Sequence, residues 1–150
     1  MANSFSAGVG AWGAKSMARI TAIRRRSVEL LAEEMTKTNK QGGLVPFQTG
    51  NLSRSLLAST SGMPMTSEAE STGSNIGAVT AVLGVDQPVW LGYQAVYAKR
   101  QNYGFVGTDS LGRTYNQAGA HFVENAVANW SQIVETAANE LQTQVESRNK

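Results

Sequence analysis

Apolar residues recur at helical spacing in the first third of the chain, with charged residues between them. No proline interrupts residues 13–40, and no glycine occurs between Gly13 and Gly42. This pattern predicts one long amphipathic helix over residues 13–40, ended by the Gly42-Gly43 pair. Its apolar positions are Met17, Ile20, Ile23, Leu30, Leu31 and Met35.

A loop and a short segment of ambiguous type are expected next. Residues 44–50 contain a proline and a glycine, which favour a loop. In residues 51–61, the four-residue spacing of Leu52 and Leu56 permits a short helix, whereas the residues that follow Leu56 resemble the start of a strand. The sequence leaves both interpretations open.

The middle of the chain predicts a small sheet. Residues 62–75 are mostly polar and have no periodicity, which predicts a mobile loop or a wide hairpin tip. Apolar side chains alternate along residues 76–85, so we expect the clearest strand of the protein there. Residues 89–93 are apolar and aromatic, and residues 95–98 are compatible with another strand. Three to four antiparallel strands follow from this pattern.

The last third predicts a second exposed loop and a second long helix. Residues 104–119 hold four glycines among Asp, Ser and Asn, which is typical of a loop. Residues 120–146 carry an almost unbroken apolar stripe at helical spacing. Its members are Phe122, Ala126, Trp130, Ile133, Val134, Ala137, Leu141 and Val145.

The predicted element order is helix, loop, sheet, loop, helix. It favours an α+β fold in which two long helices pack on a small antiparallel β-sheet of three to four strands, with long mobile loops. A chain of 150 residues is long enough for one continuous core, so we expect a single domain over residues 13–150. Residues 1–12, rich in Ala, Ser, Gly and Asn, are expected to form a flexible N-terminal arm.

Composition narrows the function classes without naming a partner. The formal net charge is only +2, far from the dense basic surface of a dedicated nucleic-acid binder. The chain contains no cysteine, which excludes disulfides, zinc fingers and thiol catalysis. No apolar run approaches the roughly 20 residues that cross a bilayer, and the first residues do not resemble a secretory signal, so no membrane partner is expected.

Catalytic chemistry has few candidates in this sequence. The one histidine, His121, stands at the predicted start of the last helix, where a lone imidazole is usually structural or exposed. Acidic residues are scattered, and Glu29 and Glu33 fit the solvated face of the first helix. We therefore expect no enzyme activity, no cofactor and no metal. A hydrolase built on His121 and dispersed Ser and Asp residues remains the weaker alternative.

Four arginines of the first predicted helix form the one charge cluster: Arg19, Arg24, Arg25 and Arg26. The ordinary interpretation is a salt-bridged or solvated face, because Arg25 and Arg26 lie at favourable spacings from Glu29 and Glu33. Contact with DNA phosphates or with an acidic neighbouring subunit is the alternative. In the first case the cluster stabilises the fold, and in the second it marks an interface.

Three ordered motifs resemble the neck and tail-completion (head-tail joining) protein family of long-tailed bacteriophages. Residues 49–56 read TGNLSRSL and resemble the family signature "TGNLRRSI". Residues 96–104, VYAKRQNYG, resemble its "YA…vEfG" element, and Gly119-x-x-Phe122-x-x-x-Ala126 matches the opening of its last helix. The motif residues are Thr49, Gly50, Asn51, Leu52, Arg54, Leu56, Tyr97, Ala98, Tyr103, Gly104, Gly119, Phe122 and Ala126.

The resemblance implies a structural virion protein that forms a ring at the head-tail junction, through which DNA passes. The implied partners are copies of the chain itself, in a hexamer or a multiple of six, and the neighbouring connector or stopper and tail-tube proteins. The implied location is the virion, and the host cytoplasm during assembly. In this picture the turn at Gly50 sets the direction of the segment after it, and Gly50 needs a positive φ.

Overall fold

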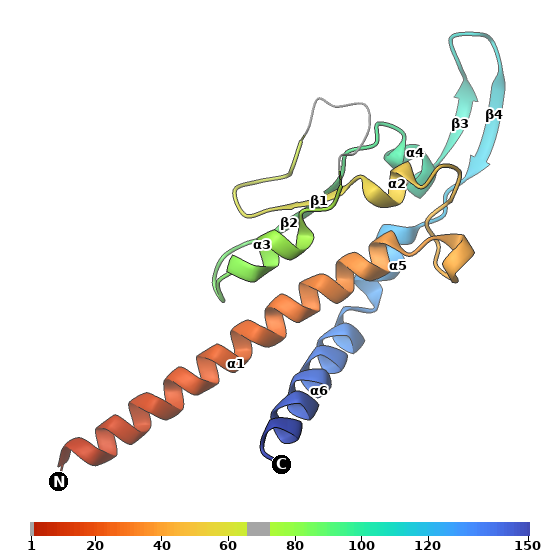
Figure 1. The fold of residues 1–150 in the computed structure, drawn as a ribbon. Coiled ribbons are helices and arrows are strands. Elements are labelled where there is room, and N and C mark those ends of the chain that lie inside the picture. Colours follow the sequence, from red (N-terminus) through yellow and green to blue (C-terminus); the bar gives the residue numbers. More distant parts are fainter. Residues whose placement is uncertain (1, 66–72) are drawn as a thin grey trace.

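The computed structural model describes residues 2–65 and 73–150, which form helices and short antiparallel strands, so the predicted α+β class is confirmed (Figure 1). The loop predicted at residues 62–75 falls partly outside the described residues. In chain order the elements are α1 (Ala2–Thr36), η1 (Asn39–Gln41), α2 (Asn51–Arg54), β1 (Leu56–Ser59), α3 (Ile76–Val82), β2 (Trp90–Tyr93), α4 (Ala98–Tyr103), β3 (Gly104–Thr108), β4 (Thr114–Ala118), α5 (Phe122–Ala128) and α6 (Trp130–Arg148).

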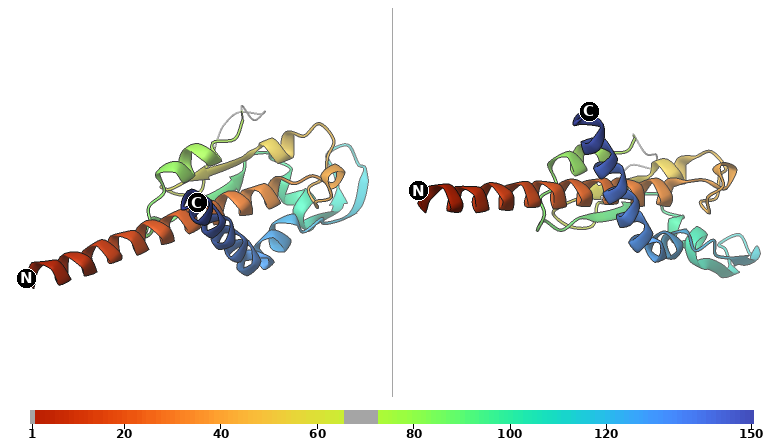
Figure 2. Two further views of the ribbon diagram at one scale, coloured as in Figure 1. Left: turned by 60° about the horizontal axis from the view of Figure 1, so that its bottom comes forward. Right: turned by 90° about the horizontal axis from the view of Figure 1, so that it is seen from below.

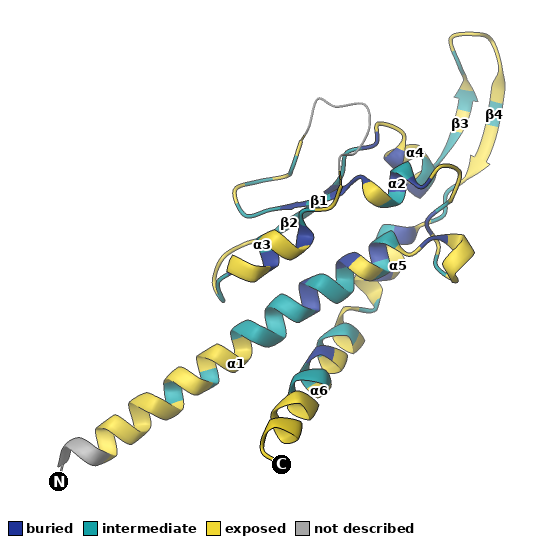
Figure 3. Ribbon diagram, in the orientation of Figure 1, coloured by how far each residue is buried: buried dark blue, intermediate teal, exposed yellow. Residues whose placement is uncertain are grey.

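The first helix, α1, is longer than its apolar pattern predicts. It begins at Ala2 rather than Gly13, so the segment predicted as a flexible arm is helical. It ends at Thr36, and the chain then turns through η1 to Gly42, whose φ of 83° is the left-handed conformation that glycine favours. Figure 3 shows a change of environment along α1: the N-terminal half is exposed, and the C-terminal half is covered by other elements.

The core lies against the C-terminal half of α1. In Figures 1 and 2, α3 and the β1–β2 ladder lie along one side of this helix, and α6 runs along another. Burial of apolar side chains in this layer is the main stabilising contribution, at about 25 cal/mol per Å² of apolar surface. The buried residues of this cluster are Ala32, Met35, Leu56, Ala58, Ile76 and Ala126.

The strands form two separate two-stranded sheets in the described residues, instead of the single sheet of three to four strands that we expected. β1 pairs with β2, with Leu56 opposite Tyr93, and β3 pairs with β4. The side chain of Asn75 takes the place of a third strand beside β1. Its Oδ1 accepts a hydrogen bond from the Ala58 N–H at 2.7 Å, and its Nδ2 donates to the Ala58 carbonyl at 2.8 Å. The backbone N–H and C=O of Ala58, which face away from β2, are thereby satisfied.

The strand predicted over residues 76–85 is wrong, because α3 occupies Ile76–Val82. Ile76, Thr80 and Leu83 are the buried positions, and their spacings of four and three residues fit a helix as well as the alternation fits a strand. A tertiary contact favours the helix: Thr80 donates its hydroxyl to the Glu29 carboxylate of α1 at 2.8 Å.

Two further predictions between residues 95 and 119 are also corrected. Residues 95–98 form a turn that leads into α4 instead of a strand. Residues 104–119 are not a loop throughout, because β3 and β4 form a hairpin that projects from the body (Figure 1). Asp109 holds the hairpin turn by accepting hydrogen bonds from the backbone N–H groups of Leu111 and Arg113, each at 2.9 Å. The glycine-rich segment 104–119 is therefore a β-hairpin with an ordered turn, where the sequence predicted an irregular loop.

The helix predicted at residues 120–146 is present but is divided in two. α5 ends at Ala128, and α6 begins at Trp130 after a break at Asn129. α6 packs along α1 and buries Ala137 completely. Trp130, which we placed in the apolar stripe, is 40% exposed.

Candidate functional site

The three motif segments meet in one place, which we call the motif junction. Leu52 of the first motif, Ala98 of the second and Phe122 of the third belong to one buried cluster, together with Val45 and Ala95. Phe122 is only 2% exposed, and its ring meets the edge of Tyr93 with centroids 5.3 Å apart. Segments that are about 25 to 45 residues apart in the chain are thus joined by apolar packing of the kind worth several kcal/mol per aromatic side chain.

The first motif forms a tight entry into α2. Gly50 has a φ of 79°, so the positive φ predicted at this position is confirmed. A Cβ at Gly50 would lie 2.7 Å from the Arg54 guanidinium and 3.1 Å from the Phe47 ring. Asn51 then donates its side-chain N–H to the Tyr97 hydroxyl at 3.1 Å, which links the first motif to the second.

Asn102 links the second motif to the third. It is 3% exposed, and its Nδ2 lies 3.0 and 2.8 Å from the two carboxylate oxygens of Glu124. Its Oδ1 accepts the backbone N–H of Val123 at 3.0 Å, which fixes the start of α5. The hydrogen bond from Asn102 lowers the pKa of Glu124, and this carboxylate in turn raises the pKa of the exposed Tyr103 hydroxyl.

The two motif glycines allow the second and third segments to cross closely. Gly104 has a φ of 84°, and a Cβ there would lie 2.4 Å from the Gln117 carbonyl oxygen. A Cβ at Gly119 would lie 2.3 Å from the carbonyl oxygen of Asn102. Backbone bonds of 2.9 Å from Ala120 to Gln101 and from His121 to Asn102 complete the crossing. Glycine is required at both positions by space rather than by flexibility alone.

The remaining apolar motif residues, Leu56 and Ala126, lie in the neighbouring core cluster beside Met35. Tyr93 connects the two clusters and donates its hydroxyl to the Met35 carbonyl of α1. Burial raises the pKa of this phenol well above its ordinary value. The motif junction is therefore anchored directly to the end of α1.

Arg24 and Arg25 of the charge cluster bind the turn that follows α3. Arg24 donates to the carbonyls of Gly84, Val85 and Gln87, with 2.7 Å between its Nη1 and the Val85 oxygen. Arg25 donates from Nε to the Leu83 carbonyl at 2.8 Å. Leu83 is the C-cap of α3, where a cation is also favoured by the helix dipole, and the other three carbonyls belong to the turn after it.

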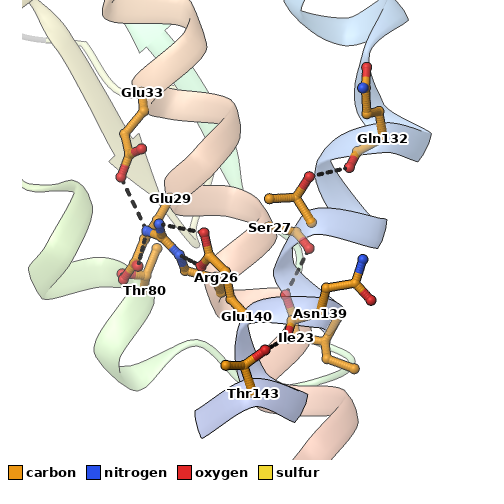
Figure 4. A network of polar contacts seen from close by, with 11 residues as sticks. Ile23, Arg26, Ser27, Glu29, Glu33, Thr80, Gln132, Asn139, Glu140 and Thr143 are labelled. Carbon is orange, nitrogen blue, oxygen red and sulfur yellow. Dashed lines mark hydrogen bonds and ion pairs between the residues drawn. The ribbon is translucent and has the colours of Figure 1, made fainter.

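Arg26 joins α1 to α6 in the network drawn in Figure 4. Its guanidinium contacts Glu140 at 2.6 Å, Glu33 at 3.1 Å and Glu29 at 3.4 Å. The hydrogen bond from Arg26 lowers the pKa of Glu140, and the bond from Glu140 raises that of Arg26. The expected pairing of Arg26 with Glu29 and Glu33 is thus observed, and Glu140 adds a third partner. Arg25, for which the same pairing was expected, instead donates to the Leu83 carbonyl. Arg19 lies apart, at the rim of a groove between α1 and α6.

The structure places His121, the candidate catalytic residue of the sequence, directly before α5. His121 is exposed, adopts a φ of 50° before α5, and has its Nδ1 3.8 Å from Glu124. A cavity of about 640 Å³ beside α1 and α6 contains Glu33, Glu34 and Lys37, but it is open to solvent. Within residues 2–65 and 73–150, no group of three or more His, Asp and Glu residues could hold a metal ion, and no helix has both the length and the apolarity to cross a bilayer.

Sequence reasoning missed two partners, Glu124 at the motif junction and Glu140 on α6. Glu124 and Glu140 were not singled out, because each gains its role from a residue far away in the chain, Asn102 or Arg26. Glu124 does have a local signal, since an acidic residue in the first turn of a helix is common.

Comparisons with protein-family models, with curated proteins and with solved structures found no match for this chain.

Proposed function

We propose that this protein is a structural virion protein of a bacteriophage neck or tail, which forms a ring at the head-tail junction through which DNA passes. One observation carries the proposal. The three motifs that resemble the neck and tail-completion family occur in family order, and their residues Leu52, Ala98 and Phe122 pack into one junction. The ring would contain six copies, or a multiple of six.

The shape of the subunit supports an assembly role. The N-terminal half of α1 and the β3–β4 hairpin project from opposite ends of the body (Figures 1 and 2). Both carry exposed apolar side chains: Phe5 and Trp12 are 79% and 71% exposed, and Val106 and Leu111 of the hairpin region are 77% and 74% exposed. Such side chains on projecting elements suit contacts with other subunits, since monomers rarely expose apolar patches without a use.

The proposal assigns no catalytic step, no cofactor and no metal. Its partners are copies of the chain, the connector or stopper, and the tail-tube protein, in the virion and in the host cytoplasm during assembly. A hydrolase that uses His121 has less support, because the imidazole is exposed and its one ion-pair partner, Glu124, is also bound by Asn102. Proton transfer in catalysis needs a nucleophile within hydrogen-bond reach of the base.

The alternative of a DNA-contacting accessory protein also has less support. Arg24, Arg25 and Arg26 are engaged with carbonyl groups and carboxylates of the same chain. Phosphate binding through them would compete with these contacts. Fluorescence anisotropy with duplex DNA at low salt tests the alternative: tight, steeply salt-dependent binding that Arg19→Ala weakens would favour DNA contact over the ring.

The ring is tested with the purified full-length chain. Light scattering should give a mass of six subunits or a multiple of six, and negative-stain images should show rings with a central opening wide enough for duplex DNA, about 20 Å or more. Tail-tube protein added to the sample should extend the ring along its axis. A monomer at every concentration, with or without tail proteins, would contradict the proposal.

A further inference from the structure

The N-terminal part of α1 carries an apolar stripe that none of the elements described in residues 2–65 and 73–150 covers. Phe5, Val9 and Trp12 are spaced by four and three residues, so they share one helix face. They are 79%, 51% and 71% exposed. We call these three residues the arm stripe.

The arm is poorly suited to stand alone in water as a helix. Residues 1–14 contain no charged side chain, so no ion pairs support it. Gly8, Gly10 and Gly13 weaken the helix. Apart from the local helix backbone and the adjacent residues, a Cβ added at any of them would meet nothing within 4 Å among the described residues. No close approach inside the subunit explains these glycines. A partner that covers the arm stripe would supply the missing stabilisation.

A groove of matching length lies between α1 and α6. Its volume is about 510 Å³, and five of its eight lining residues are small or aliphatic: Ala22, Ile23, Ala138, Leu141 and Val145. Arg19, Gln142 and Glu146 complete the lining. At about 1.5 Å per residue, the α6 wall from Ala138 to Val145 is roughly 10 Å long, as is the arm stripe from Phe5 to Trp12. The large side chains of the arm stripe could insert beside the small side chains of Ala22 and Ala138 in the groove.

The arm cannot reach the groove of its own subunit. α1 is one continuous helix from Ala2 to Thr36, and it carries the arm away from the groove, beyond the C-terminal end of α6 (Figure 1). An occupant must therefore come from another molecule. The lack of charge on residues 1–14 fits burial against protein, because no charged group would lose its hydration, and it offers nothing to phosphate groups of DNA or lipid.

We propose that the arm stripe of one subunit docks in the α1–α6 groove of a second copy of this chain. Arm and groove are different surfaces, so the contact is head-to-tail. Repeated contacts of this kind form a closed ring when the rotation from one subunit to the next is a whole fraction of a full turn. The inference rests on the proposed function for the closed ring, but self-association through this contact stands independently of it.

The first experiment measures the mass of the full-length protein by light scattering over a concentration series. The double variant Phe5→Ser/Trp12→Ser should weaken association at least tenfold. The matched control, Val82→Ser/Val127→Ser, removes two exposed apolar side chains from other helices and should associate like the parent. Equal association of the arm variant and the parent would overturn the inference, and so would a parent that stays monomeric.

Mixing separates a head-to-tail contact from a symmetric one. Val145→Glu places a charge in the groove at a position that is 44% exposed, so the fold should persist, and circular dichroism can verify this. The arm variant and the Val145→Glu variant should each stay monomeric, yet form a one-to-one dimer when mixed, because one intact arm then meets one intact groove. No dimer in the mixture would contradict the proposal.

Cross-linking gives a direct reading of the contact, since the chain has no native cysteine. Val9→Cys mixed with Ala138→Cys should yield a disulfide-linked dimer of the two variants under mild oxidation. A faster dimer of Val9→Cys alone would indicate arm-to-arm pairing and overturn the inference. Binding of the arm to lipid vesicles, lost in the arm variant while its mass is unchanged, would also overturn it.

The outcomes distinguish this inference from the proposed function. Sixfold rings that persist in the arm variant would refute the arm contact and leave the ring intact. Open chains or dimers that depend on the arm, without rings under any condition, would support the contact and contradict the ring.

Discussion

The two halves of α1 have the same secondary structure and opposite environments. In the C-terminal half, Val28, Ala32 and Met35 are at most 5% exposed, and α1 contacts α2, α3, α5 and α6. In the N-terminal half, Phe5 and Trp12 are more than 70% exposed (Figure 3). Burial of an apolar helix face is favourable in either half. Which surface covers the face depends on tertiary or quaternary contacts.

The polar side chains of the two halves differ in the same sense. The C-terminal half carries Arg24, Arg25 and Arg26, all bound to other parts of the chain. The N-terminal half has no charge before Lys15. One half is therefore tied into the monomer by both packing and hydrogen bonds, and the other half is left available for a second molecule.

The largest expected change in the free energy of unfolding distinguishes the buried motif junction from the exposed arm stripe. Phe122→Ala should lower the free energy of unfolding by about 3–5 kcal/mol, because it removes a buried ring where the three motifs meet. Phe5→Ala should change it by no more than about 0.5 kcal/mol, since that side chain is 79% exposed. Urea unfolding at a concentration where the protein is monomeric measures both. Similar losses for the two variants would mean that the arm stripe is packed within the monomer.

Glycine-to-alanine substitutions should have opposite signs in the two regions. Gly104→Ala should cost about 2–3 kcal/mol, because φ is 84° and the new Cβ would lie 2.4 Å from the Gln117 carbonyl oxygen. Gly10→Ala should stabilise the arm helix by about 1 kcal/mol, since nothing lies within 4 Å of its Cβ position. Thermal unfolding reports the first, and helical circular dichroism the second. A stable Gly104→Ala protein would argue against the close crossing.

A third substitution tests the polar link of the motif junction. Asn102→Leu should cost about 1–3 kcal/mol, because the Val123 N–H loses its acceptor and Glu124 loses two hydrogen bonds. Asn125→Leu, at an exposed position of α5, is the matched control and should stay within about 0.5 kcal/mol of the parent. Equal urea midpoints for the two variants would show that Asn102 contributes nothing specific.

The smallest expected effect is the pH dependence of the bond between Arg26 and Glu140. Because Arg26 lowers the Glu140 pKa from 4.5, its stabilising contribution is present above pH 4.5 and is lost as pH falls through the lower, folded-state value. Glu140→Gln should therefore flatten the dependence of melting temperature on pH in that acidic range. The stability involved is under about 1 kcal/mol, since the side chains of Arg26 and Glu140 are 30% and 38% exposed. Glu135→Gln on the same helix is the control, and an identical slope in both variants would contradict the assignment.

Much of the fold could be predicted from local patterns. Helical periodicity located α1 and the C-terminal helices, and the ambiguity at residues 51–61 was real, since α2 and β1 both lie there. The positive φ at Gly50 followed from its place in the motif. For the candidate site, the sequence supplied the three motifs and the pairing of Arg26 with Glu29 and Glu33, which are one and two helical turns away.

Tertiary structure decided what local patterns leave open. Residues 76–82 fit both a helix and a strand, and in the folded protein they form α3, with Thr80 buried and bonded to Glu29 of α1. The helical arm, the split at Asn129 and the β3–β4 hairpin were likewise beyond the sequence pattern. By itself the sequence determined which faces are apolar and where the backbone must turn, because these depend on neighbouring residues. Which faces meet, and which stay uncovered, depends on contacts between residues far apart in the chain, and only the folded arrangement brings those together.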